Sequence, residues 1–278
     1  LTNGQDTWRA RYAETHTPGS EGGSGKRTGG NTGTAPGAYL TVAQHDAARR
    51  LWLIGLDLAR AAEHPQAGDL TVYLLADMAL QAVRLGRADE ALRLVHLGDI
   101  TVLGARPVSA STASLLAGIQ ARAHALRRDA VGCDRALGLA RERLSAIDPA
   151  TAPPWTAYIG QTGLPGHHGA AHYTLALASR DPRAASRAVP LLRHAVDGFG
   201  QDYAKLRAVY LPDLAGAHAL AGDADTAVTL GHQAVDAVTA AHSPMSYDRL
   251  RVLDTALKPL HDSAGVVELR DRLASTAA

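Results

Sequence analysis

The sequence contains a single cysteine, Cys133, and its aromatic residues make up only 4% of the chain. One cysteine excludes an internal disulfide framework and a cysteine-based zinc site. No uninterrupted apolar run approaches the ~18 residues of a membrane-spanning helix, and no apolar stretch near Leu1 resembles a signal peptide. We therefore expect a soluble protein of the reducing cytoplasm, with no membrane contact.

An excess of one charge is also missing. The 28 lysines and arginines nearly balance the 27 aspartates and glutamates, which gives a net charge of +1. Nucleic-acid-binding domains usually have a strong basic stripe and a high pI. Here the arginines alternate with acidic residues, as on a solvated helix face. We expect no direct nucleic-acid binding by this chain.

Motifs of catalysis are absent as well. The sequence has no Gly-x-Ser-x-Gly elbow, no cysteine–histidine pairing and no clustered acid pair. Gly25-Lys26 does not form a phosphate loop, because Ser20 stands where that loop needs glycine and Arg27 follows the lysine. An enzyme is therefore not the favoured interpretation, and no cofactor is expected.

The composition favours helices. Apolar residues make up 46% of the chain, and alanine and leucine dominate among them. Residues 1–37 are rich in Gly and Thr and cannot bury enough apolar surface to offset the entropy of ordering, so we expect a flexible segment. From residue 38 to 278, helical segments alternate with short turns that contain Gly, Asp or Pro. This pattern predicts one all-α domain.

A repeated phrase marks the turns of this domain. Gly86 lies five residues before Ala91, and Gly222 lies five residues before Ala227. The glycine would end one helix in a left-handed conformation, and the small residue would lie where the next helix presses on the first. Degenerate copies of the phrase place small residues at Ala48, Cys133, Ala185 and Ala188.

The spacing of these small residues is about 40, in the range of helical-hairpin arrays. It predicts a tetratricopeptide-like helical-hairpin solenoid of about five units, with a concave groove. A stretch rich in Pro and Gly near 147–169 interrupts the period and is expected to be an irregular insertion.

The repeat is broken at its front. Residues 44–48 correspond to the turn and second helix of a hairpin, and Gly-rich sequence stands where the first helix is expected. Either that helix is missing, so that the chain is a fragment or degenerate descendant of a longer protein, or a cap forms in another way; we favour the first. The missing helix would leave an apolar face uncovered, which consists of Leu51, Trp52, Ile54 and Leu58. A partner chain is one candidate to cover it.

Several phrases resemble those of a known family. They are Asp148–Tyr158, Arg207–Leu211 with Leu214-Ala215, Ser243-Pro244 with Tyr247–Leu250, and Ser263–Leu273. Together they are similar to the C-terminal tetratricopeptide region of actinomycete (Streptomyces-type) transcriptional regulators of the Xre family. That resemblance implies a sensor or oligomerisation module that recognises a peptide, protein or small molecule. The helix-turn-helix of that family is not expected in this chain.

Histidines provide one candidate site. His168 and His172 have the i,i+4 spacing of two zinc ligands on a helix, and His167 adjoins them. The metalloprotease version needs a glutamate where Gly169 stands, and no third ligand is indicated. We therefore expect no metal here and regard the histidines either as lining a groove or interface or as ordinary packing and surface residues.

Aromatic and polar residues provide the others. Trp155 and Tyr158 would plug the irregular gap between hairpins, contact a ligand, or both. Arg207 and Tyr210 are i,i+3 on a first helix and either hold a carboxylate or peptide backbone or are a solvated arginine and a packed tyrosine. Weaker candidates on an earlier first helix are Asp77 and Gln81.

These observations favour a regulatory binding scaffold that recognises a peptide, partner protein or small ligand in its groove, as a homodimer. Two alternatives stay open. One is an enzyme or biosynthetic accessory protein with a pocket near Trp155–His172. The other is a structural oligomerisation subunit that uses the uncovered face near residues 51–58.

Overall fold

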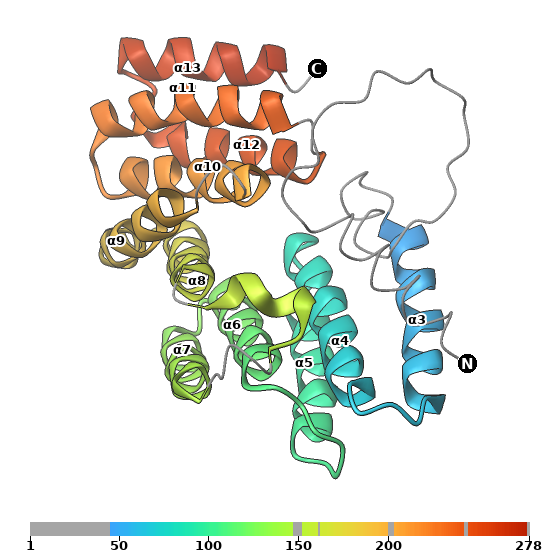
Figure 1. Cartoon of the computed structure of the whole chain (residues 1–278). Helices are drawn as coiled ribbons and strands as arrows, with labels where there is room; N and C mark the ends of the chain where they lie inside the picture. Colours follow the sequence, from blue (N-terminus) through green and yellow to red (C-terminus); the bar gives the residue numbers. More distant parts are fainter. Residues whose placement is uncertain (1–44, 147–151, 161, 200–202, 242–243, 277–278) are drawn as a thin grey trace, which may run out of the picture.

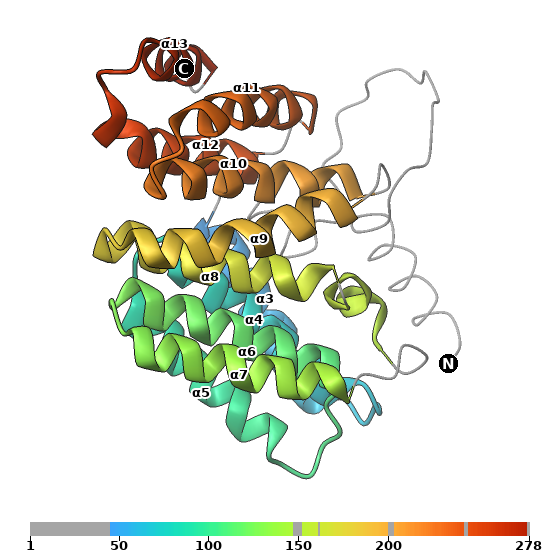
Figure 2. The same ribbon diagram turned by 90° about the vertical axis from the view of Figure 1, so that its left-hand side faces the viewer.

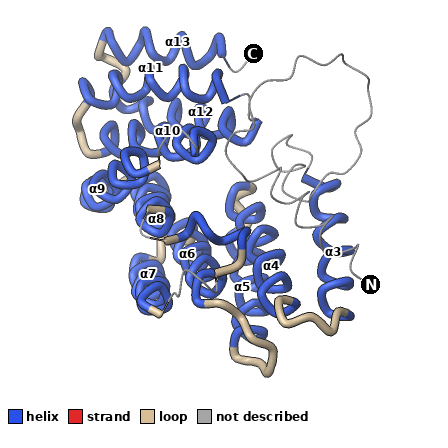
Figure 3. Tube along the Cα trace, in the orientation of Figure 1, coloured by secondary structure: helices blue, strands red, loops and turns tan. Residues whose placement is uncertain are grey.

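The computed structural model describes residues 45–146, 152–160, 162–199, 203–241 and 244–276. The predicted flexible segment 1–37 lies outside them. Within the described residues all regular structure is helical, in eleven α-helices and two short 3₁₀ helices (Figure 3). The prediction of an all-α chain is confirmed for this part.

The helices pair as sequential antiparallel hairpins behind one leading helix, α3 (His45–Ala61) (Figure 1). We call the members of each pair its first and second helix. The pairs are α4 (Ala67–Arg84) with α5 (Ala88–Val102), α6 (Ala110–Leu126) with α7 (Ala130–Ser145), α8 (Gly163–Ser179) with α9 (Pro182–Gly198), α10 (Ala204–Leu220) with α11 (Ala224–Ala241), and α12 (Pro244–Leu257) with α13 (Ala264–Thr276).

The hairpins stack in chain order, as Figure 2 shows from α4 to α13. Each first helix packs against the next: α4 on α6, α6 on α8, α8 on α10, and α10 on α12. The first helices therefore form the buried layer of the array, and α4, α6, α8 and α10 have most of their residues out of solvent. This arrangement is that of a helical repeat.

The small residues predicted to lie between the helices of each hairpin are all fully buried. They are Ala48, Ala91, Cys133, Ala185, Ala188 and Ala227. Each lies near the start of a second helix or of α3. Close helix approach leaves room only for a small side chain at this position, and in α7 a thiol replaces the methyl group of alanine.

The turns also follow the predicted pattern. Gly86 and Gly222 follow the first helices α4 and α10 and have φ of 73° and 90°, the left-handed conformation that ends a helix at low cost in glycine. Arg128 and Arg180 have φ of 60° and 54° in the turns after α6 and α8. Those two arginines adopt a conformation that side chains disfavour.

Two of the hairpins share a histidine–aspartate hydrogen bond that was not predicted from the sequence. His124 Nδ1 lies 2.8 Å from Asp129 Oδ2, and His218 Nδ1 lies 2.9 Å from Asp223 Oδ2. Each aspartate also accepts a hydrogen bond from a backbone N–H in the first turn of the second helix. The same phrase, Ala-His-Ala-Leu-x-x-Asp-Ala, thus joins the end of one helix to the start of the next.

The predicted irregular insertion at 147–169 is narrower than expected. Its first residues, 147–151, lie outside the described part of the chain. The 3₁₀ helix η1 (Pro154–Ile159) follows, and α8 already begins at Gly163. Trp155 of η1 is 2% exposed and belongs to the apolar core around α4 and α6, so it fills the space between hairpins.

The leading helix α3 packs on α4 by one face only. Trp52 is fully buried, whereas Leu53, Ile54 and Leu58 are 49%, 56% and 68% exposed. The residues that precede α3 are outside the described part, so the question of a lost first helix stays a prediction. Among the described helices, none is both long and apolar enough to cross a membrane.

Candidate functional site

Charged side chains lie within the buried layer of first helices. Arg84 lies near the end of α4, Arg122 on α6 and Arg249 on α12. Arg122 and Arg249 are only 5% and 8% exposed. We call these three residues the arginine cluster. Burying cations is costly unless each is paired and hydrogen-bonded, so their partners decide how the cluster is interpreted.

The arginines are incompletely paired. Within the described part of the chain, Arg122 Nε and both Nε and Nη1 of Arg84 are buried without a hydrogen-bond partner. Guanidinium N–H groups in a dry site are strong donors that favour carboxylate or phosphate oxygens. The cluster therefore presents donors without acceptors.

The three cations also act on one another. Burial, followed by the charges of Arg249 and Arg122, lowers the pKa of Arg84 to about 9. Burial, followed by the charge of Arg249, lowers the pKa of Arg122 to about 10. Both side chains stay protonated at pH 7, and the mutual repulsion would be relieved by an anion placed between them.

Three carboxyl groups act on the charges of the cluster, those of Asp77 on α4, Asp213 on α10 and Asp248 on α12. Asp213 Oδ1 on α10 accepts a hydrogen bond from Arg249 Nη1 across 3.4 Å. Burial raises the pKa of Asp213 while Arg249 opposes that shift. Burial raises the pKa of Asp77 on α4 to about 7, against the opposing charge of Arg84. Because Asp77 is partly protonated near pH 7, the three carboxyl groups offset the three guanidinium charges incompletely.

Aromatic rings border the same region. Tyr210 on α10 stacks on Phe199 with 5.9 Å between ring centroids and 5° between planes. His167 on α8 meets the Tyr210 ring edge-on at 6.4 Å and lies 6.3 Å from the Tyr158 ring. Tyr210 fits against α8 because Gly166 has no side chain, since a Cβ there would lie 2.7 Å from Tyr210 Cζ.

His167 is a neutral polar group at this border. Burial, followed by the positive charge of Arg122, lowers its pKa to about 3. Both ring nitrogens lack a hydrogen-bond partner among the described residues. A neutral imidazole offers one donor and one acceptor, so His167 can add a directional hydrogen bond beside the guanidinium groups.

The arrangement is suited to binding an anion. It joins three cations, a neutral histidine and tyrosine rings drawn from α4, α6, η1, α8, α10 and α12. Charge-assisted hydrogen bonds of this kind are among the strongest polar contacts that a protein makes. A carboxylate or phosphate group is the ligand chemistry that would satisfy the free donors.

The structure brings three of the sequence-predicted site residues to this cluster. Tyr158 lies within electrostatic range of Tyr210, Asp77 and Arg84, all of which influence the pKa of its hydroxyl, which burial raises. Asp77 and Tyr210 line the same region, as described above. Asp77 and Tyr210 come from different hairpins and Tyr158 from η1, and their proximity follows from the stacking of first helices.

The other predicted residues lie elsewhere. Gln81 is buried and donates a hydrogen bond to His45 O across 2.9 Å, which ties α4 to α3. Trp155 packs near Tyr73, with 6.3 Å between ring centroids. Arg207 is exposed. His168 and His172 are buried near charged groups of α7 and α9, away from the arginine cluster.

Sequence reasoning missed the arginines themselves. Arg122 lies between Ala121 and Ala123 within a helix of mostly apolar or small residues, and Asp213 lies between Pro212 and Leu214. A charged residue on a helix buried on nearly all sides is the signal that could have identified both. No protein-family model, curated protein or solved structure matches this chain.

Proposed function

We propose that the chain is a regulatory binding scaffold that holds an anionic group of its ligand against the arginine cluster. The ligand is a peptide, a partner protein or a small molecule that carries a carboxylate or phosphate. The scaffold is of the tetratricopeptide type, and the inner face of its first helices forms the concave groove. On this account the protein works in the cytoplasm.

The observation that carries the proposal is the set of buried guanidinium donors without acceptors at Arg84 and Arg122. A protein that used these residues only for packing would gain by replacing them with apolar side chains. Their presence beside His167 and Tyr210 is understandable if an anion completes the site, because an anion would supply acceptors for the unpaired donors and negative charge beside the arginines.

The resemblance to Xre-type regulators supports the regulatory part of the proposal. In such a system the binding domain senses a ligand, and a separate helix-turn-helix contacts DNA. The chain by itself is then expected to give no specific complex with DNA in a gel-shift titration at physiological salt. A sharp complex would contradict this part.

Calorimetric titration of the whole chain tests the proposal. The probes are sulfate, citrate and a pair of peptides that differ only by Glu-to-Gln replacement, all at constant ionic strength. We expect the anions to bind and Arg122→Gln to bind them at least about 10-fold more weakly, the effect of losing one charge-assisted hydrogen bond. The matched control is Arg183→Gln, an exposed arginine of α9.

Two results would count against the proposal. One is equal affinity of Arg122→Gln and the parent chain for every probe. The other is no heat of binding for any anion beyond that of chloride at the same ionic strength. The Arg207→Gln variant tests whether the binding groove extends along α10. If it does, this variant should bind the peptides more weakly and the small anions as tightly as the parent chain.

A homodimer remains a prediction, and the exposed apolar side chains of α3 are its candidate interface. Sedimentation of the whole chain beside a Leu58→Glu variant would measure it. The pocket imagined near Trp155–His172 has less support, because Trp155 packs in the core and His172 faces α7.

A further inference from the structure

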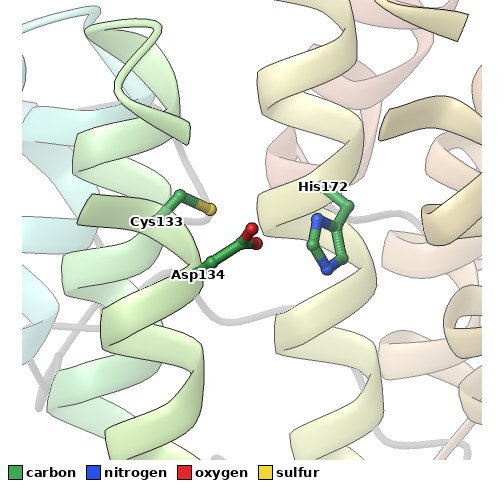
Figure 4. Close-up of side chains that lie close together, drawn as sticks. All are labelled: Cys133, Asp134 and His172. Carbon is green, nitrogen blue, oxygen red and sulfur yellow. The ribbon is translucent and has the colours of Figure 1, made fainter. Parts of the chain in front are cut away.

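A second cluster of chemically active side chains lies at the contact of α7 with α8. Cys133 and Asp134 are consecutive residues of α7, and His172 lies on α8. One potential ligand atom of each, the thiol sulfur, a carboxylate oxygen and an imidazole nitrogen, lies within 4.8 Å of the other two (Figure 4). This group is separate from the arginine cluster.

His172 is a buried polar member of this group. It is 8% exposed, and its Nδ1 has no hydrogen-bond partner among the described residues. Figure 4 shows its ring directed at the carboxylate of Asp134. Burial lowers the pKa of His172, so the imidazole is neutral at pH 7 and can offer a lone pair to a metal ion.

Cys133 and Asp134 complement this nitrogen. Burial raises the pKa of the Cys133 thiol to about 12, so the free thiol is protonated, whereas coordination to a divalent metal removes that proton. Asp134 is half exposed, with 51% of its side chain accessible. It therefore leaves a route from solvent to the two buried groups.

We propose that Cys133, Asp134 and His172 form a binding site for a zinc-class divalent ion that links α7 to α8, with water as the fourth ligand. A sulfur, nitrogen and oxygen donor set suits Zn²⁺ or Co²⁺ and does not suit Ca²⁺ or Mg²⁺, which take oxygen ligands. The single cysteine argued against a zinc site built on cysteines. In the fold, Asp134 and His172 supply the other two protein ligands.

Binding requires a local adjustment. Metal–ligand bonds of about 2.0–2.3 Å place tetrahedral ligand atoms roughly 3.5 Å apart. In the structure the three ligand atoms lie within 4.8 Å of one another, so they would have to move closer together. Asp134 can move, because its surface ion pair with Arg187, at 3.2 Å, is weak and exposed. Arg187 and Arg141 are the cations near His172, so Arg187 competes with the metal for the carboxylate.

Titration of the whole chain with Co²⁺ tests the site, because a cobalt–thiolate bond gives a charge-transfer absorption band that oxygen and nitrogen ligands do not give. Zn²⁺ should displace the cobalt and abolish the band. Competition with a chromogenic chelator then yields the zinc affinity. The melting temperature should rise with zinc in the parent chain, since a ligand of the folded state stabilises it.

Four variants complete the test. Cys133→Ala is expected to fold, because alanine occupies the matching position in other hairpins, and to lose the band. His172→Gln and Asp134→Asn should bind zinc at least about 10-fold more weakly, and Arg187→Gln should bind it more tightly. His96→Gln, an exposed histidine of α5, is the control and should match the parent.

The outcome is decisive in either direction. Loss of the band in Cys133→Ala with circular dichroism unchanged supports the site. Zinc binding of equal affinity in the parent, Cys133→Ala and His172→Gln would show an adventitious ion only and overturn it, as would a parent chain that gives no cobalt–thiolate band. Neither result bears on the anion site, because the arginine cluster shares no residue with this one.

Discussion

Arg249 of α12 donates a hydrogen bond from Nη1 to Oδ1 of Asp213 of α10 across 3.4 Å, and the two side chains are only 10% and 1% exposed. The contact joins the last two first helices of the array. It satisfies one oxygen of the carboxylate, while Oδ2 has no partner within the described residues. Asp213 is therefore the internal counter-ion of the arginine cluster, and one of its oxygens stays unpaired.

The first prediction concerns this counter-ion. Asp213→Asn should lower the free energy of unfolding by roughly 3 kcal/mol, because a buried arginine loses its charged partner. The same change should tighten sulfate binding, because the carboxylate no longer competes with the ligand. Urea denaturation and calorimetry measure the two effects.

The matched control for that variant is Asp236→Asn, which removes the partner of Arg272 on the surface. An exposed pair contributes at most about 1 kcal/mol. If Asp213→Asn were as stable as this control and bound sulfate no better than the parent, the counter-ion role would be wrong.

The second prediction is a pH dependence of binding. The pKa of Asp77 is raised to about 7 by burial, so the carboxyl becomes neutral as pH falls through about 7 and Arg84 loses a competing anion. Sulfate, whose charge is constant there, should bind more tightly at pH 6 than at pH 8, about one unit on either side of that pKa. Asp77→Asn should remove most of this difference.

The same group has a consequence for stability. A carboxyl whose pKa is raised on folding destabilises the folded state as pH rises from about 4 to about 7. Asp77→Asn should therefore be more stable than the parent above pH 7 and should lack this decline. Denaturation midpoints at both ends of the window decide the sign, and the opposite order would contradict the burial argument.

The third prediction concerns the turns. Arg128→Gly and Arg180→Gly should each stabilise the fold by about 1 kcal/mol, because glycine adopts positive φ without the steric cost paid by other residues. Gly86→Ala and Gly222→Ala should destabilise it by a similar amount. Thermal unfolding of the four single variants measures this, and destabilisation by either arginine-to-glycine change would show an unrecognised contact of that side chain.

The fourth prediction concerns Gly166. A Cβ at this position would lie 2.7 Å from Tyr210 Cζ, so Gly166→Ala should destabilise the protein by about 1–3 kcal/mol through overpacking and weaken sulfate binding by displacing the ring. Gly138→Ala in α7 is the control, because its Cβ meets nothing within 4 Å and alanine is the better helix former. Equal effects of both changes would contradict the close packing.

The sequence predicted those parts of the fold that depend on local spacing. The glycine–alanine phrase at Gly86 and Ala91 fixes a helix end and a helix contact within one hairpin, and the structure has both. The hydrogen bond between His124 and Asp129 also lies within one hairpin turn, so the same local spacing could have predicted it. Its signal is the phrase Ala-His-Ala-Leu-x-x-Asp-Ala, which occurs at residues 123–130 and again at 217–224.

The arginine cluster could not be predicted in the same way. Arg84, Arg122 and Arg249 come from α4, α6 and α12, and their proximity depends on how three hairpins stack. Spacing along the chain carries no information on that arrangement. Conversely, residues close together in the sequence can face different parts of the fold. His167 lies at the arginine cluster, whereas His172, on the same helix, faces α7.

The central claim is that an anion binds to the free guanidinium donors, and the Nε–H resonances of arginine in nuclear magnetic resonance spectra report on those donors directly. Titration of the whole chain with sulfate at constant ionic strength should shift the Nε–H signals of Arg84 and Arg122, assigned with the Arg84→Gln and Arg122→Gln variants. The signal of the exposed Arg183 should stay in place. Unchanged signals from both cluster arginines, or equal shifts at Arg183, would contradict the account.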